Sequence, residues 1–358
     1  MSELPLRDDL RGMEPYGAPV SASAVPLNVN ENPYAPPAAI VEEMGRAVAS
    51  ALVDANRYPD REATQLRAAL AEYVGGVSAA NIWAANGSNE VMQHIFGAFG
   101  GPGRVALSFS PTYSMYPQYA RETFTRFVTV PRRADHSLDR GVVEQALFGE
   151  RPSIVVVASP NNPTGTLLGS DELSWLVSDC AGVGAILVVD EAYGEFVSPT
   201  RHSATQSVLQ YGNLVVTRTL SKAFGLAALR LGYAVAPAGI VDALRLVRLP
   251  YHLSAATQAA ALVALQHADT MLGPIPTIRA EREQLAVALE SLGLNVAASE
   301  ANFVYVSGFA DSHRVFSELL DRGYLVRESG PPGNLRISVG TPQQNRDLIQ
   351  QLSEVLEP

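Results

Sequence analysis

A lysine and an arginine interrupt an otherwise apolar stretch of the chain. Lys222 follows Ser221 shortly after an apolar run that ends near Thr217, and Arg230 lies eight residues further on. A charged group in apolar surroundings needs a partner, and a desolvated lysine amine can form a Schiff base with a carbonyl group. An arginine nearby can bind a phosphate. Most lysines beside serines are solvated surface charges, so the neighbouring motifs must decide between the two interpretations.

Two further apolar runs end in residues that suit such a site. Residues 186–189 lead into Asp190 and then Tyr193, and residues 154–158 lead into a turn, SPNNPTG, that contains Asn162. Ligands of doubly wound sheets lie beyond the carboxyl ends of the strands, and Asp190 there is a good partner for a buried cation. The simpler interpretations are a helix cap for Asp190 and an ordinary turn around Asn162.

A candidate anion site precedes an apolar-periodic helix. The sequence ANGSNE places Ser88 and Asn89 at the predicted helix start, where free backbone amides bind anions and Gly87 allows close approach. A Ser or Asn cap without a ligand explains the same residues equally well. Tyr113, in the SPTY that follows another apolar run, could stack on a flat ring or simply pack.

The composition excludes several other classes of protein. A chain of 358 residues, 47% hydrophobic and 17% charged, suits a globular protein of two domains. No apolar run approaches the roughly 18 residues that span a bilayer, and the first residues lack a signal peptide, so we expect a cytoplasmic protein without membrane contacts. A net charge of −10 without a basic run gives no sign of nucleic-acid binding. The single cysteine and the unpaired histidines predict neither a disulfide nor a metal site.

The order of the apolar runs predicts the elements that position these residues. Residues 1–37 are expected to form an N-terminal arm, 38–250 a large domain, and 251–358 a smaller α+β domain that the arm helps to complete. Short Val, Ile and Leu runs alternate with amphipathic helices, which predicts an α/β, doubly wound, mainly parallel sheet. Strands are expected at 104–109, 124–130, 154–158, 186–189, 214–217 and 233–236, and in the small domain at 302–306, 324–328 and 335–339. Helices are expected near 38–53, 61–74, 88–99, 255–270 and 274–292, and after Pro111, Leu138, Ser170, Thr200 and Thr341.

Taken together, the motifs are similar to those of a known family. In content and order, GSNE, SPTY, SPNNPTG, VVDEAY, LSKAF and LRLGY resemble the fold-type-I pyridoxal-phosphate aminotransferases of classes I and II, over nearly the whole chain. Within that group the sequence is most similar to the histidinol-phosphate aminotransferase family, on NVNENPY, RYPD, GPGR, DEAYGEF, RLPYHLS and LRISVGTP. The resemblance implies a sheet of the seven-stranded type, pyridoxal 5'-phosphate as cofactor, and a homodimer with shared active sites.

The resemblance also implies a role for each candidate residue. Lys222 is expected to bond to the cofactor aldehyde and to carry protons, and Asp190 to pair with the pyridine nitrogen. Tyr193 and Asn162 are expected to hydrogen-bond the ring oxygen. The remaining cofactor contacts are expected from Tyr113, which would stack on the ring, and from the phosphate ligands Ser88, Asn89, Ser221, Arg230 and, from the other subunit, Tyr58.

The expected substrate contacts are two arginines and part of the arm. Arg336 corresponds to the arginine that binds a carboxylate and Arg327 to one that binds a phosphate, and bidentate arginine suits both groups. Tyr16 and Asn32 are expected to close over the side-chain end, although an arm that only packs is nearly as good an explanation. Ala228 replaces the usual family glycine and could shift the packing near the phosphate.

The implied function is transamination between histidinol phosphate and 2-oxoglutarate in histidine biosynthesis, with a small-molecule amino donor and keto acceptor as partners. Two alternatives use the same scaffold, an aromatic amino-acid aminotransferase and a threonine-phosphate-type decarboxylase, because a fold does not fix a function. A non-catalytic protein that inherited the fold is a third possibility. Retention of Lys222, Asp190 and Arg230 argues against it.

Overall fold

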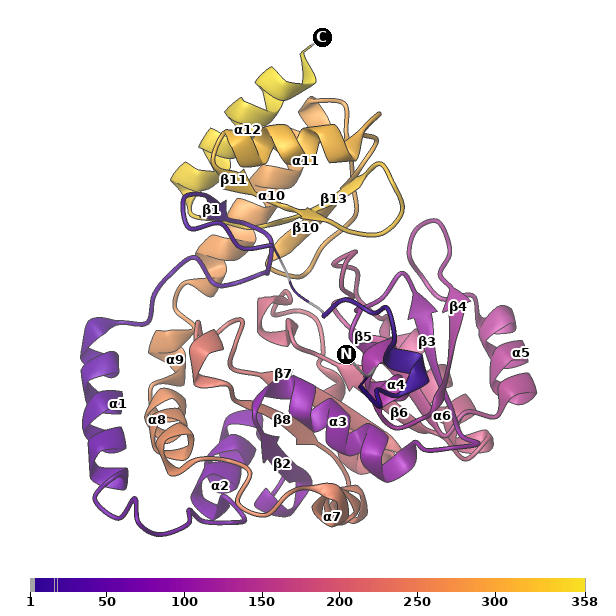
Figure 1. Cartoon of the computed structure of the whole chain (residues 1–358), viewed down its shortest axis with the longest axis vertical. Coiled ribbons are helices and arrows are strands. Elements are labelled where there is room, and N and C mark those ends of the chain that lie inside the picture. The colour runs from indigo at the N-terminus through magenta and orange to yellow at the C-terminus, as the bar shows by residue number, and fades with distance from the viewer. Residues whose placement is uncertain (1–3, 16, 18, 358) are drawn as a thin grey trace.

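A seven-stranded sheet forms the centre of the larger domain (Figure 1). The structure is a computed structural model that describes residues 4–15, 17 and 19–357. The strand order is β2-β8-β7-β6-β5-β3-β4, and every neighbouring pair is parallel except the two that β8 makes. The predicted α/β fold with a mainly parallel sheet is therefore confirmed. The strands are β2 (Ile82–Ala85), β3 (Val105–Ser110), β4 (Arg126–Pro131), β5 (Ile154–Ala158), β6 (Ile186–Asp190), β7 (Leu214–Thr219) and β8 (Gly232–Val235).

Helices cover both faces of this sheet because its central strands are apolar on both faces. Alternate residues of β7 show this, since Val215 packs in one buried cluster and Leu214 and Val216 pack in the other. The helices on the Val215 side are α3 (Gly87–Phe99), α4 (Tyr116–Glu122) and α7 (Ala238–Val247). Those on the opposite side are α1 (Ala38–Ala51), α2 (Thr64–Val74), α5 (Arg140–Glu150), α6 (Ser170–Gly182) and α8 (Ala255–Gln266).

The smaller domain has a core of its own beside the carboxyl ends of the large sheet. Its four-stranded antiparallel sheet has the order β12-β13-β10-β9. A strand of the N-terminal arm, β1 (Val25–Pro26), pairs in parallel with β11 (Tyr324–Leu325). The other elements are β9 (Asn295–Val296), β10 (Phe303–Ser307), β12 (Arg327–Glu328), β13 (Asn334–Ser338), α10 (Ile275–Ser291), α11 (Ser312–Asp321) and α12 (Pro342–Leu356).

Helix α8 packs with the large domain, although the domain boundary expected after residue 250 would assign it to the small domain. Ala260, Ala261 and Ala264 of α8 are buried in the same cluster as Ile40 and Met44 of α1. A helix rich in Ala, Val and Leu on all sides can be buried between other elements, so α8 lies with the large domain. The small-domain core takes its helical residues from α10 onwards, because the short helix α9 (Ala268–Met271) still contributes Met271 to the large-domain cluster.

Two elements of the large domain and helix α11 of the small domain were not predicted from the sequence, and two predicted segments have a different structure. β2 and α7 were not predicted, and the run at 324–328 forms two short strands, β11 and β12, that belong to different sheets. The segment after Thr200 forms a 3₁₀ helix, η4 (Ala204–Gln210), instead of an α-helix.

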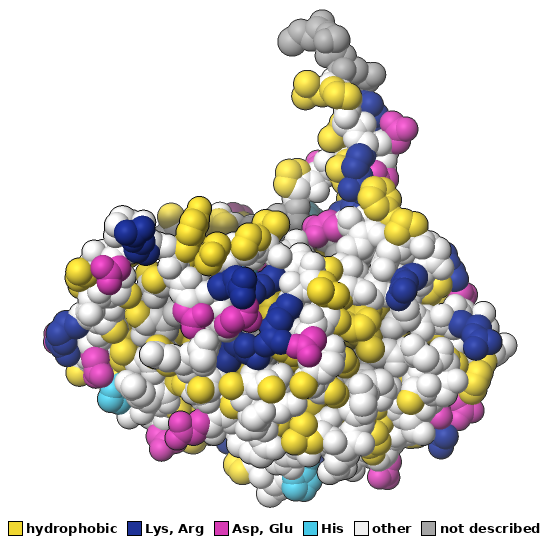
Figure 2. Space-filling view, turned by 90° about the horizontal axis from the view of Figure 1, so that it is seen from below, with side chains coloured by type: hydrophobic (Ala, Val, Ile, Leu, Met, Phe, Trp, Pro, Cys, Tyr) yellow, Lys and Arg dark blue, Asp and Glu magenta, His cyan; other side chains and the backbone are white. Residues whose placement is uncertain are grey.

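Exposed apolar residues gather on the lower face of the large domain. Figure 2 shows this face, with hydrophobic side chains beside a group of basic and acidic ones. The end of α7 and the segments that follow α1 and α7 contribute the exposed residues Leu52, Val53, Tyr58, Leu246, Leu249 and Tyr251. Within the described ranges, no helix is long and apolar enough to cross a membrane. The same part of the chain contains no group of three or more His, Cys, Asp or Glu residues arranged to hold a metal ion.

Candidate active site

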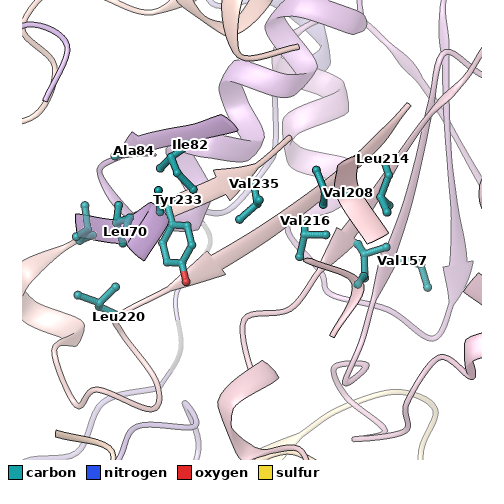
Figure 3. Packing of buried hydrophobic residues seen from close by; sticks show 14 of the residues in the cluster. Leu70, Ile82, Ala84, Val157, Val208, Leu214, Val216, Leu220, Tyr233 and Val235 are labelled. Carbon is teal, nitrogen blue, oxygen red and sulfur yellow. The ribbon is translucent and has the colours of Figure 1, made fainter. Parts of the chain in front are cut away.

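The carboxyl ends of the central strands open into a cavity of about 480 Å³ between the two domains. The strands that lead to it are anchored in the core, and Figure 3 shows Val157 of β5, Leu214 and Val216 of β7 and Tyr233 and Val235 of β8 packed together. Rigid strands can therefore hold the side chains at their ends. The predicted residues that line the cavity are Ser88, Asn89, Tyr113, Asn162, Asp190, Tyr193, Ser221, Lys222, Arg230, Arg327 and Arg336.

Lys222 lies three residues beyond β7 and is the only lysine of the chain. Its Nζ donates a hydrogen bond of 2.7 Å to the backbone carbonyl of Val29 in the arm. Burial, followed by the positive charge of Arg336, lowers the pKa of the Lys222 amine to about 8. A neutral amine is the nucleophilic form, and a pKa of about 8 leaves roughly a tenth of Lys222 neutral at pH 7, far more than for an ordinary exposed lysine.

Asp190 ends β6, and its side chain is buried against the cavity. Its carboxylate accepts hydrogen bonds from the Tyr116 hydroxyl at 2.8 Å, the Thr217 hydroxyl at 3.1 Å and the Ala192 backbone amide at 3.2 Å. Burial raises the pKa of Asp190 despite these bonds. Among the described residues, no Lys or Arg side chain hydrogen-bonds to this carboxylate, so a cation in the cavity would relieve the cost of its burial.

Arg336 and Asn162, which both line the cavity, connect the two domains. Nη1 of Arg336, on β13, donates to Oδ1 of Asn162 at 2.6 Å, and its Nη2 donates to the Asn28 carbonyl at 2.5 Å. Tyr193 lies close by, with its ring 5.0 Å from that of Phe303, centroid to centroid. The guanidinium of Arg336 is therefore held in one orientation from two sides, which suits the recognition of a planar anion.

Ser88, Ser221 and Arg230 surround a candidate anion site at the start of α3. Arg230 Nη1 donates to the Ser221 hydroxyl at 3.4 Å and to the Ala227 carbonyl at 2.9 Å. A side chain on Gly87 would put its Cβ 2.7 Å from Arg230 Nη2, so the glycine lets the guanidinium approach the helix start. Free amides, two hydroxyls and a guanidinium together suit a phosphate.

Two predicted site residues of the described part of the chain, Tyr58 and Asn32, do not line the cavity. Tyr58 is 79% exposed and stacks on Tyr251 with 4.4 Å between the ring centroids. Asn32 donates to the Ala223 carbonyl at 2.9 Å and packs against the segment after the lysine, outside the cavity lining, so its expected closure over the substrate stays a prediction. Tyr16 lies outside the described residues. Ala228 is exposed, so its methyl group points away from the packed interior.

Several residues of the site were missed by sequence reasoning. Tyr116 and Thr217 hold Asp190, and the arm contributes Asn28 and Asn30, which are almost completely buried. The two arm residues stand at alternate positions of the NVNENPY motif. Alternating asparagines could have indicated that this part of the arm faces the site. Nothing in the local sequence indicates that Tyr116 belongs to it.

Comparison with known proteins gives this arrangement its class. The family model for aminotransferase class I and II matches residues 22–352. Among curated relatives, the histidinol-phosphate aminotransferase of Thermobifida fusca is 53% identical over 96% of this chain and 93% of its own length. That of Paenarthrobacter aurescens is 47% identical over 100% of this chain and 96% of its own length. The structure of histidinol-phosphate aminotransferase from Sinorhizobium meliloti, in complex with pyridoxal-5'-phosphate, is 27% identical, covers 92% of this chain and 90% of its own, and superposes with a TM-score of 0.82.

The chain therefore belongs to the class I and II aminotransferases and, among them, to the histidinol-phosphate aminotransferase family. The family resemblance expected from the motifs is confirmed. Pyridoxal phosphate is the cofactor of this class, and the residues of the cavity fit its three reactive parts. The only lysine suits the aldehyde, the uncompensated Asp190 carboxylate suits a protonated ring nitrogen, and the start of α3 with Arg230 suits the phosphate.

Proposed function

We propose that this protein transfers the amino group of histidinol phosphate to 2-oxoglutarate, giving imidazole acetol phosphate and glutamate, as a cytoplasmic step of histidine biosynthesis. The proposal is based on one observation, that a single cavity contains both the groups suited to the cofactor and the arginines suited to anionic substrates. Lys222, Asp190 and Arg230 line it from the large domain, and Arg327 and Arg336 line it from the small domain. The identity of about half of all residues to named histidinol-phosphate aminotransferases supports this choice of substrate.

Each proposed role follows from the chemistry of a side chain. Bound pyridoxal phosphate would supply an aldehyde that takes up the amino group and a ring that spreads the charge left on the substrate carbon. Lys222 would hold and return the proton at its Nζ, for which a pKa of about 8 is suitable. Asp190 would keep the ring nitrogen positively charged, and Tyr193 and Asn162 would donate to the ring oxygen. Tyr113 would stack on the ring face.

The proposed binding roles divide between the two domains. Ser88, Asn89, Ser221 and Arg230 would hold the cofactor phosphate on the large-domain side. Arg336 would bind the carboxylate of glutamate, and Arg327 would bind the phosphate of histidinol phosphate. Two separate arginines would let one cavity accept two different anionic substrates in alternate half-reactions.

A substrate comparison tests this function directly. Loss of histidinol phosphate should depend on 2-oxoglutarate and should be faster, as kcat/KM, than the reaction of phenylalanine. Equal or faster turnover of phenylalanine would identify an aromatic aminotransferase instead. Release of carbon dioxide from threonine phosphate would identify a decarboxylase.

We also propose a homodimer in which Tyr58 reaches the cofactor phosphate of the partner subunit. Support comes from the stacked pair of Tyr58 and Tyr251 and from Leu246 and Leu249, all of which are exposed to solvent in the single chain. Mixing Tyr58→Ala with Lys222→Ala subunits should restore activity, because one site of each mixed dimer then has both native residues. Statistical exchange of two-fold symmetric subunits predicts about a quarter of the wild-type rate. No recovery after proven subunit exchange would contradict shared sites.

A further inference from the structure

Asn30 of the N-terminal arm has an unusual backbone conformation and a side chain whose oxygen and nitrogen both form hydrogen bonds. Its φ is 57°, in the left-handed region, and the residue is only 1% exposed. Asn is one of the few non-glycine residues that adopt this region at modest cost. Its backbone amide donates to the Ser338 hydroxyl at 2.9 Å, and its carbonyl accepts from Nδ2 of Asn302 at 3.0 Å. The small domain therefore holds this arm residue in place.

The Ser338 hydroxyl also fixes which way the Asn30 side-chain amide faces. Ser338 Oγ donates to Oδ1 of Asn30 at 3.0 Å, which leaves Nδ2 of Asn30 to donate to the Tyr193 hydroxyl oxygen at 2.9 Å. An amide NH₂ group donates hydrogen bonds and accepts none. The oxygen of Tyr193 is therefore the acceptor in this bond, and the hydroxyl hydrogen of Tyr193 must point to a different acceptor.

The contact joins three parts of the molecule at one phenol. Asn30 belongs to the arm, Ser338 ends β13 of the small domain, and Tyr193 follows β6 of the large domain. Asn30, Tyr193 and Lys222 all line the cavity, and Nζ of Lys222 lies 5.9 Å from the centroid of the Tyr193 ring. The orientation of the Tyr193 hydroxyl thus depends on how the arm and the small domain pack.

We propose that Asn30 is a positioning residue for Tyr193, whose hydroxyl hydrogen it directs toward the cavity by donating to the phenol oxygen. This inference rests on the proposed function, because the acceptor in the cavity would be the ring oxygen of bound pyridoxal phosphate. A phenol that accepts one hydrogen bond is a stronger donor in a second one. Asn30, aligned by Ser338, therefore strengthens the bond by which Tyr193 stabilises the anionic form of that oxygen.

The expected consequence is a change in the acidity of the bound cofactor. A hydrogen bond donated to an anionic oxygen favours the deprotonated state, so weakening Tyr193 should raise the pH at which the cofactor absorbance band changes. Loss of one such polarising bond should raise this midpoint by roughly half a pH unit. The charged groups that share the cavity stay unchanged in the variants below, namely Lys222, Asp190, Arg230, Arg327, Arg336, Glu31 and Glu328.

The principal variant is Asn30→Gly, because glycine keeps the left-handed backbone and removes only the side chain. The measurement is a spectral pH titration of the purified holoenzyme, with kcat and KM beside it. We expect a raised midpoint, a lower kcat and little change in KM. Ser338→Ala should move the midpoint in the same direction by a smaller amount, since it keeps the Asn30 side chain but removes the hydroxyl that accepts from the Asn30 backbone amide and donates to its Oδ1. Arg151→Gly is the matched control, because Arg151 is an exposed residue with φ of 46° outside the cavity.

A second substitution separates positioning from packing. In a Tyr193→Phe background, Asn30→Gly should cause no further shift of the midpoint, because the phenol through which it acts is gone. An additional shift there, or an unchanged midpoint in both Asn30→Gly and Ser338→Ala, overturns the inference while leaving the proposed enzyme intact. If Asn30→Gly does not fold, the titration midpoint of Ser338→Ala alone tests the inference, and an unchanged midpoint in that variant overturns it. A wild-type protein that takes up no pyridoxal phosphate would instead refute the proposed function.

Discussion

Arg336 donates from Nη1 to Oδ1 of Asn162 over 2.6 Å, and so links β13 of the small domain to the turn after β5. Its second bond, to the Asn28 carbonyl, involves the arm. A guanidinium fixed in this way loses little freedom when it binds a carboxylate. Substrate binding and the docking of the small domain are therefore expected to depend on each other.

Substitution of Arg336 and Arg327 should separate the two substrates. Arg336→Lys should raise the KM for glutamate by about tenfold or more, because a lysine cannot make the bidentate contact. Arg327→Ala should raise the KM for histidinol phosphate by a similar factor and leave that for glutamate nearly unchanged. Steady-state kinetics with each substrate varied in turn measure both effects. Loss of cofactor from either variant would contradict the assignment, because neither arginine is assigned to the cofactor phosphate.

Asp190 should make the stability of the cofactor-free protein depend on pH. Burial raises the pKa of Asp190 in the folded state above its ordinary value of 3.8, so the folded protein binds the proton more tightly than the unfolded chain. The stability that this proton contributes is fully present below pH 3.8 and is lost as the pH rises through the folded-state pKa. The cofactor-free Asp190→Asn variant has no carboxyl group at this position, so its stability should not fall with pH for this reason.

Denaturant unfolding of both cofactor-free proteins between pH 4 and pH 7 measures the effect. Relative to Asp190→Asn, the wild type should become steadily less stable as the pH rises. A constant difference would mean that Asp190 is not perturbed. With cofactor and substrates, the same variant should lose at least roughly a hundredfold in kcat, because the neutral amide cannot hold a charged ring nitrogen.

Much of the fold could be predicted from the sequence because the central strands are continuous apolar runs. β5, β6 and β7 are buried over nearly their whole length, and such runs have few alternatives to a parallel sheet covered on both faces. β2 was missed because four residues, IWAA, give too short a pattern beside the stronger helix signal of α3. The position of α8 depends on tertiary packing against α1, which no local pattern encodes.

The candidate site was predictable where a residue ends a strand or lies in the short segment just after it. Asp190, Asn162 and Lys222 lie at such positions, and the sheet topology alone brings them together. Tyr116 and Asn30 could not be found in this way, since their partners Asp190 and Tyr193 are distant in sequence. Only one of the 26 basic residues is a lysine, and this fact, which was not used, was the strongest indication that Lys222 has a chemical role.

The only lysine makes its own reactivity measurable. In cofactor-free protein, the rate at which dinitrofluorobenzene modifies Lys222 should rise as the pH passes through about 8, because the lowered pKa releases the neutral amine there. An exposed lysine would titrate about two units higher. Peptide mapping by mass spectrometry distinguishes Lys222 from the N-terminal amine. A midpoint near the ordinary value of 10.5 would mean that the amine is not desolvated.

Gly87 should control cofactor affinity through the space it leaves for Arg230. A Cβ at this position would lie 2.7 Å from Arg230 Nη2, and the φ of +79° disfavours any side chain. Gly87→Ala should therefore displace the guanidinium and raise the dissociation constant for pyridoxal phosphate by roughly tenfold or more, as expected for 1–3 kcal/mol of strain.

Gly45→Ala is the matched control, since its Cβ would meet nothing within 4 Å. Within helix α1 that change should stabilise the protein by about 0.5–1 kcal/mol and leave cofactor affinity unchanged. Equal affinity in the two variants, measured by equilibrium titration of the cofactor absorbance, would show that the phosphate does not bind at the start of α3.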